Sequence, residues 1–290
     1  MLFDTENLKK ALIEIDKASP YYPTEWKLLD DAPEKLYALG EARLLRGRKL
    51  AVVGSRRTPA NVLKLGAELG KELSKYFTLV TGTADGGDSA AIEGGLAGSG
   101  KVICLLAGGF SALPQCNLQL LERVAQHGLL LSPHPFETEV RAFSYEYRNK
   151  LIATLCDGTL VLSAGEKSGA LITAKYAQKA GKKTFALPYP PNAAAGAGCN
   201  ALIKKGAYLT ESAEDVLTQF GIEESIEKKE IALSADEERL YQALQDLGES
   251  HVSALSQKTG VPIFKARAVL SALEVKGLAV SVGGNRYTLV

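Results

Sequence analysis

The sequence of 290 residues predicts an α/β fold: an extended Rossmann-like, mostly parallel sheet with helices on both faces, followed by a small C-terminal winged helix-turn-helix domain. Apolar runs alternate with helical patterns across residues 39–222, which is typical of consecutive βαβ units. Several of these runs are apolar throughout, as expected for strands that helices cover on both sides. Residues 233–290 carry three helical patterns and a hairpin signal, which predict the second domain.

The first 38 residues precede the sheet-forming pattern. A helical stretch over residues 5–15 is followed by a segment with several prolines and tyrosines over residues 20–31. So short a segment cannot bury a core of its own. We therefore expect residues 1–38 to be a helical extension that packs on the following domain.

Residues 39–222 form the predicted Rossmann-like domain. Its strands are expected at residues 49–53, 78–81, 101–106, 129–131, 159–162 and 183–186, and its helices at 62–75, 89–97, 117–126, 147–155 and 169–180. Glycine follows almost every predicted strand. Because ligands of open α/β sheets bind beyond the carboxyl ends of the strands, the binding site is expected among these glycine-rich ends.

The C-terminal part begins with a charged stretch, residues 223–232, which lacks an apolar period and is expected to be a linker. In residues 233–290, Ser234 and Ser250 are predicted N-caps of two helices, and Pro262 begins a third. This domain has six basic and six acidic side chains. We expect such a neutral winged helix to contact a protein, or duplex DNA weakly, rather than to recognise a specific operator.

The overall charge of +1, from 34 basic and 33 acidic side chains, at first disfavours a nucleic-acid ligand. The distribution is uneven, however, because residues 39–222 carry 21 basic and 15 acidic side chains, a net charge of +6. Four cysteines and three histidines show no ligand spacing, so neither a metal site nor a cofactor is expected. The sequence shows no membrane span and no secretion signal, so we expect a cytoplasmic protein without membrane contacts.

The first candidate site follows the first predicted strand, which runs into Gly54, Ser55, Arg56 and Arg57. Backbone N–H groups in a glycine turn before a helix suit a phosphate, and guanidinium groups add charge and paired donors. The alternative is a plain tight turn, because the pattern is not the GxGxxG of dinucleotide-binding loops. A second glycine-rich loop contains Asp85 and Asp88, which we interpret as turn-forming residues rather than metal ligands.

A third cluster interleaves aromatic and basic residues at a helix start, with Tyr145, Arg148, Asn149 and Lys150. Rings that stack bases and cations that hold phosphates are typical of proteins that bind single-stranded nucleic acid. The alternative is a solvated basic helix start whose tyrosines lie in the core.

The fourth candidate is the helix start at Ser168 and Gly169, where small residues leave the N-terminus open to an anion. Lys175, two turns later, would reach either a phosphate or only solvent. The sequence lacks a nucleophile elbow, a Walker loop and an obvious pair of catalytic carboxylates, so no enzyme activity is expected.

Four motifs in this order, VVGSR (52–56), RNKLIATLCDGTLVL (148–162), SGALITAKYA (168–177) and GxNALIKKGA (198–207), resemble the DNA-processing protein A family, also called DprA or Smf. The resemblance implies an extended Rossmann fold that binds single-stranded DNA without catalysis. It also implies a homodimer that protects incoming DNA and helps to load the RecA recombinase during natural transformation.

The resemblance carries over most of the candidate residues to a DNA pocket. They are Gly54, Ser55, Arg56, Arg148, Asn149, Lys150, Ser168, Gly169 and Lys175, with Tyr145 in the place of a family phenylalanine. Departures mark a divergent member: Ser163 and Pro133 replace family glutamates, and Lys150 replaces an arginine, which removes a paired donor.

Two other functions remain open at this stage. One is a Rossmann-type enzyme resembling the phosphoribohydrolases of nucleoside monophosphates, although their PGGxGT loop is replaced by Ser168, Gly169 and Ala170. The other is a paralogue that acts only as a protein scaffold.

Overall fold

The computed structural model describes residues 4–222 and 233–289, and the chain divides into two compact units on either side of the residues between these ranges. We call residues 4–222 unit 1 and residues 233–289 unit 2. The linker expected at residues 223–232 lies outside the described residues. Within the two described ranges, no helix is both long enough and apolar enough to cross a membrane.

Unit 1 is built on one sheet, in which the strands of residues 4–222 lie in the order β1-β2-β6-β5-β4-β3-β7-β8-β9. The strands are β1 (Ile13–Asp16), β2 (Lys35–Gly40), β3 (Lys49–Gly54), β4 (Thr78–Thr81), β5 (Val102–Leu105), β6 (Leu129–Ser132), β7 (Gly158–Ser163), β8 (Lys183–Ala186) and β9 (Tyr208–Leu209). From β6 to β9 neighbouring strands are parallel, whereas β2 pairs antiparallel with β6 and with β1. The predicted mostly parallel sheet is confirmed.

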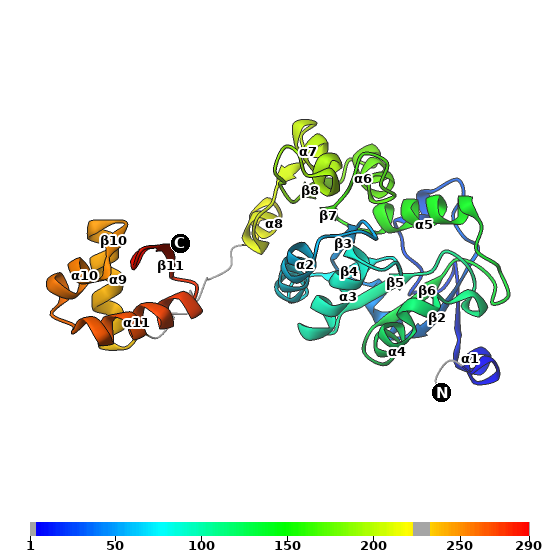
Figure 1. Cartoon of the computed structure of the whole chain (residues 1–290). Coiled ribbons are helices and arrows are strands. Elements are labelled where there is room, and N and C mark those ends of the chain that lie inside the picture. The colour runs from blue at the N-terminus through cyan, green and yellow to red at the C-terminus, as the bar shows by residue number, and fades with distance from the viewer. Residues whose placement is uncertain (1–3, 223–232, 290) are drawn as a thin grey trace. The chain divides into compact units, whose positions relative to one another are not determined.

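Helices cover both faces of this sheet (Figure 1). They are α1 (Thr5–Ala11), α2 (Ala60–Leu73), α3 (Gly87–Ala97), α4 (Leu118–His127), α5 (Ala142–Leu155), α6 (Ala170–Lys179), α7 (Ala197–Lys204) and α8 (Ala213–Gln219). In β3, Ala51 and Val53 share a core with α5, α6 and α7, whereas Leu50 and Val52 share one with α2, α3 and α8. Successive side chains of a strand point to opposite faces of the sheet, so β3 contributes residues to two separate cores, one on each face.

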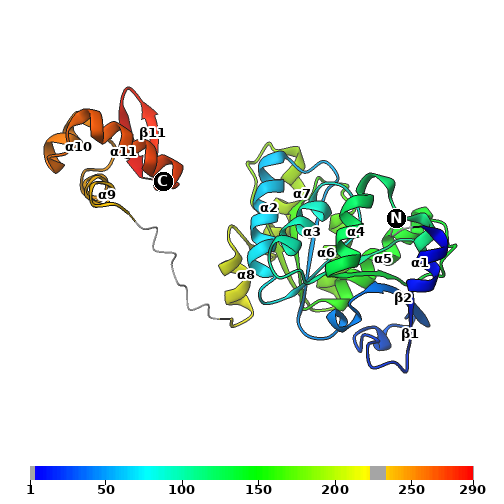
Figure 2. The same ribbon diagram turned by 90° about the horizontal axis from the view of Figure 1, so that it is seen from below.

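The expectation that residues 1–38 are helical is wrong in part. Helix α1 ends at Ala11, and β1 follows it as an antiparallel partner of β2. In β1 only Ile15 is buried, and its neighbours Glu14 and Asp16, which point to the other face, are exposed. Figure 2 shows α1, β1 and β2 together at one end of unit 1.

This N-terminal segment also packs against α5. Trp26, in the 3-10 helix Trp26–Leu28, is fully buried, and its indole Nε1 donates a hydrogen bond to the Leu151 carbonyl at 3.1 Å. The Tyr147 hydroxyl donates to the Asp31 carbonyl at 2.8 Å, and Lys150 Nζ lies 2.6 Å from Asp31 Oδ1. Three polar contacts therefore hold α5 against residues 26–31, and they involve the Tyr147 and Lys150 side chains and the Leu151 carbonyl.

Helices α7 and α8 are not predicted by the sequence pattern. Helix α7 begins within a glycine-rich stretch, residues 196–200. A Cβ on Gly198 would lie 2.8 Å from the Ala164 carbonyl oxygen, so the glycine permits this helix to pack closely on the end of β7.

Unit 2 has the three helices and the hairpin that its sequence predicts. They are α9 (Ala235–Leu247), β10 (Ser250–His251), α10 (Val252–Thr259), α11 (Ile263–Val275), β11 (Ala279–Gly283) and β12 (Arg286–Leu289). Ser234 caps α9 as expected, but His251, not Ser250, is the N-cap of α10 and accepts from the Ser253 N–H. The assignment of this unit as a winged helix-turn-helix stays a prediction.

Candidate nucleic-acid interface

The order of the strands reverses at β3, which pairs in parallel with β4 on one side and with β7 on the other. At such a switch point the connections leave toward opposite faces, and a crevice opens beyond the carboxyl ends of the strands. A hollow of about 410 Å³ lies there, and we call it the switch-point pocket. Its lining comprises Val53, Gly54, Ser55, Arg56, Arg57, Gly82, Ala84, Asp88, Tyr145, Arg148, Asn149, Ile152, Ser168, Gly169, Ala170 and Thr173.

A larger hollow, of about 910 Å³, lies among α2, α3 and the start of α4. Its charged lining residues are Asp85, Glu93 and Arg123, and the arginine is paired with Glu93 at 2.9 Å. Such a lining leaves no excess of positive charge for a phosphate. The switch-point pocket is therefore the stronger candidate for an anionic ligand, although it is the smaller hollow.

The loop after β3 forms one wall of the switch-point pocket. The Ser55 N–H donates to the Ser163 carbonyl at 2.9 Å and to the Ser163 hydroxyl at 3.1 Å, which binds this loop to the end of β7. A Cβ on Gly54 would lie 2.8 Å from the Gly87 Cα, so this position requires glycine. The wall therefore consists of backbone, with Arg56 and Arg57 exposed beside it.

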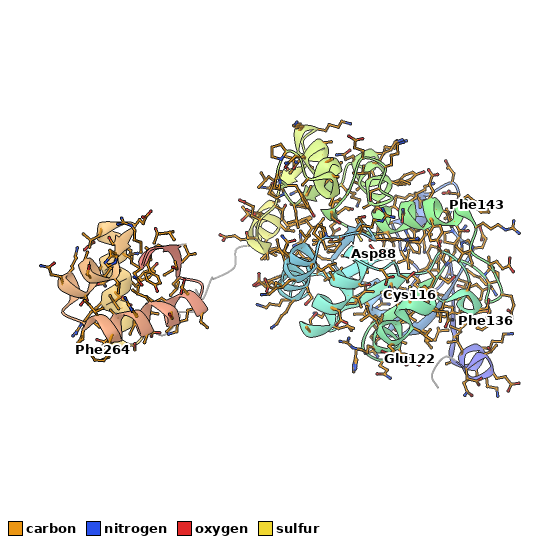
Figure 3. All side chains as sticks on the ribbon, in the orientation of Figure 1. Asp88, Cys116, Glu122, Phe136, Phe143 and Phe264 are labelled. Atoms are coloured by element: carbon orange, nitrogen blue, oxygen red, sulfur yellow. The ribbon has the colours of Figure 1, made fainter. Side chains whose placement is uncertain are left out.

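Asp88, at the start of α3, connects two loops beneath the pocket, and Figure 3 labels it in the interior of unit 1. The side chain is buried, and its two carboxylate oxygens accept from the Gly54 and Ala84 N–H groups at 3.4 Å each. Burial raises the pKa of this carboxyl, and the charge of Arg148 opposes the increase. The interpretation of Asp88 as only a turn former is therefore incomplete, because it holds two pocket loops together.

Arg148 projects from α5 into the same region and is only 6% exposed. Its Nη1 donates to the Leu105 carbonyl at 3.4 Å, and within the described residues its buried Nε has no hydrogen-bond partner. Burial lowers the pKa of the guanidinium, and Asp88 opposes that change. Because a buried cation with an unused donor is costly, an anion in the pocket would stabilise it.

Tyr145 lies at the mouth of the pocket, and its side chain is 41% exposed. The guanidinium carbon of Arg56 is 5.7 Å from the centre of its ring, and that of Arg148 is 5.9 Å away. Both distances are within the range of cation–π contacts. An aromatic surface and two cations from separate parts of the chain thus meet at one place.

Asn149 joins α5 to the loop before α6, because its side-chain Nδ2 donates to the Gly169 carbonyl at 3.2 Å. Gly169 is the N-cap of α6, where the sequence suggests Ser168, but the Ser168 hydroxyl accepts from the Ala170 N–H at 3.4 Å. The open start of α6 therefore completes the pocket opposite the loop after β3.

The structure brings most of the predicted site residues to the switch-point pocket and leaves two outside its lining. Those that line it are Gly54, Ser55, Arg56, Arg57, Tyr145, Arg148, Asn149, Ser168 and Gly169. Lys150 instead pairs with Asp31, since two residues along a helix turn a side chain by about 200° from Arg148. Lys175 is exposed on α6, away from the lining.

Sequence reasoning missed the part played by Gly82 and Asp88. A Cβ on Gly82 would overlap the Arg148 guanidinium, so glycine is needed for that side chain to enter the pocket. The available signal was the position of both residues in the second glycine-rich loop, at the carboxyl end of β4. Ser163 departs from that pattern, and its hydroxyl lies 2.5 Å from the Thr58 hydroxyl.

Comparison with family models and with curated proteins gives the same family. Residues 14–221 match the family described as DNA recombination-mediator protein A. DNA processing protein DprA of Bacillus subtilis (strain 168) is 37% identical over 217 residues, which cover 73% of this chain and 72% of that protein. Protein Smf of Escherichia coli (strain K12) is 30% identical over 288 residues, which cover 93% and 76%.

Two of the solved structures that are similar to this chain are of DNA processing protein A. DNA processing protein A from Streptococcus pneumoniae has a TM-score of 0.69 and 32% identity, and the match covers 74% of this chain and 78% of that one. A structure on the single-stranded DNA binding mode of DNA processing protein A from Helicobacter pylori has a TM-score of 0.65 and 30% identity, covering 72% and 95%.

Proposed function

The chain belongs to the DNA recombination-mediator protein A family, and on this premise we propose that it binds single-stranded DNA in the switch-point pocket without catalysing a reaction. The observation that carries the proposal is the buried guanidinium of Arg148, with its unused Nε, beside the exposed ring of Tyr145. A phosphate would satisfy the guanidinium while a base stacks on the ring. The relative from Helicobacter pylori is described as binding single-stranded DNA.

Three further features support a nucleic-acid ligand. The net charge of residues 39–222 is +6, from 21 basic and 15 acidic side chains, and the pocket lies in this part of the chain. The backbone wall at Gly54 and the open start of α6 would accept phosphate oxygens without reading base identity. We therefore expect binding that tolerates many sequences.

The lining of the pocket does not favour hydrolysis of a nucleotide. Among the residues that line it, Asp88 is the one carboxylate, and it is engaged by the backbone of Gly54 and Ala84. A phosphoribohydrolase-like reaction would require a carboxylate with access to the sugar. Incubation with nucleoside monophosphates should therefore release no free base, and release that Arg56→Ala abolishes would support the enzyme instead.

The direct test is fluorescence anisotropy with a labelled oligonucleotide at two salt concentrations. We expect tighter binding of single strands than of duplex, with a steep decrease in affinity at higher salt because counterions are released. Arg56→Ala should weaken binding and reduce the salt slope by about 0.7, the value for one phosphate contact on a single strand.

Arg43→Ala is the matched control, because Arg43 is an exposed arginine in the 3-10 helix Ala42–Leu45, which precedes β3 at the other edge of the sheet. Equal affinity for single strand and duplex, or equal effects of the two substitutions, would contradict the proposal.

Further parts of the proposal come from the family resemblance. We propose that the chain acts in the cytoplasm as a homodimer that protects incoming DNA and helps to load RecA in natural transformation. Its test is RecA-dependent ATP hydrolysis on DNA coated with a single-strand-binding protein, which this chain should accelerate. Ser163 and Pro133 replace family glutamates, so a chain that binds DNA need not load RecA. If the chain binds single-stranded DNA but does not accelerate ATP hydrolysis by RecA, the proposed DNA binding stands and the proposed RecA loading is rejected.

A further inference from the structure

Phe143 is an aromatic side chain that the fold leaves in solvent. It lies in the first turn of α5 and is 66% exposed, whereas Phe77, Phe110 and Phe185 of the same unit are buried. Figure 3 shows Phe143 at the outer edge of unit 1. Exposure of a large apolar ring is unfavourable in water, so a ring in this position beside a functional site is a candidate contact for a ligand.

The ring borders a hollow of about 480 Å³ that is distinct from the switch-point pocket. The loop between β6 and α5 and the first turn of α5 form this hollow, which is lined by His134, Glu137, Thr138, Glu139, Arg141, Phe143 and Ser144. We call it the α5-start hollow. Phe143 is the one large apolar side chain in that set, and the others are polar or charged.

Two exposed charged groups of the α5-start hollow have no ion-pair partner among the described residues. The buried Nε2 of His134 has no hydrogen-bond partner among the described residues, and its ring packs against Tyr147 with the centres 5.9 Å apart. Glu137 pairs with Lys9 at 2.5 Å, whereas no ion pair joins Glu139 or Arg141 to another described residue. One carboxylate and one guanidinium therefore remain available beside the aromatic ring.

The two hollows lie along the same edge of the sheet. Strand β6 runs parallel to β5, so the loop that follows Ser132 leaves from the carboxyl edge, where the switch-point pocket also opens. The Ser132 hydroxyl donates to the Gly108 carbonyl at 2.8 Å and accepts from the His134 N–H at 3.0 Å, which fixes the start of the loop. Helix α5 begins where this loop ends.

Phe143 and Tyr145 are two residues apart on α5, so their side chains point about 200° apart around the helix axis. One therefore borders the α5-start hollow and the other borders the switch-point pocket. The first turns of α5 therefore lie between the two hollows.

We propose that Phe143 and the α5-start hollow form a second base-binding position for the strand that occupies the switch-point pocket. This inference rests on the proposed function. The ring offers a face for stacking, Glu139 would accept hydrogen bonds from an exocyclic amino group of a base, and Arg141 would contact the adjoining phosphate. A protein partner fits less well, because the core of a protein interface needs a continuous apolar surface and this ring is surrounded by polar groups.

The test compares Phe143→Ala, Phe143→Trp and Tyr145→Ala in the full chain, by anisotropy with deoxycytidine oligonucleotides of about 4 to 16 nucleotides, whose bases carry the exocyclic amino group. For long strands we expect Phe143→Ala to weaken binding about tenfold, the effect of losing one stacked base, and Phe143→Trp to retain the affinity. For the shortest strand that binds, Phe143→Ala should match the unsubstituted chain, because that strand fills only the switch-point pocket.

Phe264→Ala is the control for loss of an exposed aromatic ring, because Phe264 is exposed on α11 of unit 2. A direct readout is photocrosslinking to a strand with one 5-iodouracil, followed by mass spectrometry of the attached peptide. Crosslinks to Phe143 and Tyr145 should come from different positions of the iodinated base.

If Phe143→Ala binds every length normally while Tyr145→Ala is impaired, the second position is refuted and the proposed function stands. If the unsubstituted chain binds no single strand, both fail. If Phe143→Ala weakens binding equally for oligonucleotides of every length, the second base-binding position is also refuted, since the substitution would then affect the protein as a whole.

Discussion

The guanidinium of Arg56, in the loop after β3, lies 5.7 Å from the centre of the Tyr145 ring at the start of α5. The contact joins two sequence-distant segments at the mouth of the switch-point pocket. It also places a cation next to the ring against which we expect a base to stack.

We predict that Tyr145→Ala weakens single-strand binding by about 5-fold to 150-fold, because stacking on an aromatic ring contributes ~1–3 kcal/mol per base. Tyr145→Phe should bind almost normally, since it keeps the ring face and loses only the hydroxyl. Anisotropy titrations of the two variants measure the difference. A phenylalanine variant as weak as the alanine variant would show that stacking is not the role of this residue.

Two glycines of the pocket should respond differently to the same change. Gly82→Ala would place a methyl group on the Arg148 guanidinium, whereas a Cβ on Gly169 would meet only the Asn149 Nδ2, at 4.0 Å. We predict at least a tenfold loss of affinity for Gly82→Ala, because the guanidinium must leave its position, and about twofold at most for Gly169→Ala. Equal affinities of the two variants, in chains with normal circular dichroism, would refute the placement of Arg148.

Trp26 is the single tryptophan of the chain and is fully buried against α5. Trp26→Phe should lower the free energy of unfolding by ~1–3 kcal/mol, because it removes the hydrogen bond to the Leu151 carbonyl and leaves unfilled volume. Urea unfolding followed by circular dichroism measures the loss. Leu28→Ala, two residues away at an 88% exposed position, should change the stability little.

Unit 2 should lose stability in acid through Glu237. A hydrogen bond from Lys276, followed by those from Ser234, lowers the pKa of this carboxyl from 4.5 to about 2. Because the folded pKa lies below the ordinary value, this carboxyl stabilises the folded state above pH 4.5, and the contribution disappears as the pH falls toward 2.

The measurement is urea unfolding of the full chain and of Glu237→Gln between about pH 3 and pH 6, with an amide signal of α9 as the probe. The glutamine variant should be the less stable at pH 6, and the difference should decrease toward pH 3. A difference that stays constant or grows toward pH 3 would contradict this prediction.

The centre of the sheet could be predicted from sequence because its strands are apolar runs buried on both sides, as β3 and β7 are. The strands at the two edges of the sheet could not be predicted from the sequence. Strand β9 is two exposed residues, and β1 is recognisable only once β2 is beside it. The end of α1 at Ala11 likewise depends on that pairing, since the local sequence favours a longer helix.

The candidate site was predictable where backbone geometry demands a residue type, as at Gly54. It was less predictable where the role of a long side chain depends on which residues the fold brings next to it. Adjacency to Arg148 suggests that Lys150 shares its role, but the helix turns that lysine toward Asp31. Conversely, the polar contacts of Asp88 arise only when the start of α3 packs beneath two loops.

The three contacts between residues 26–31 and α5 have a kinetic consequence. The helix that carries Phe143, Tyr145 and Arg148 is held in place by these contacts before any ligand arrives. Ordering of these groups therefore belongs to folding, and little conformational entropy is left to lose during association. Loosening the attachment, for example with Asp31→Ala, should leave the contacts with a ligand intact but shorten the lifetime of the complex.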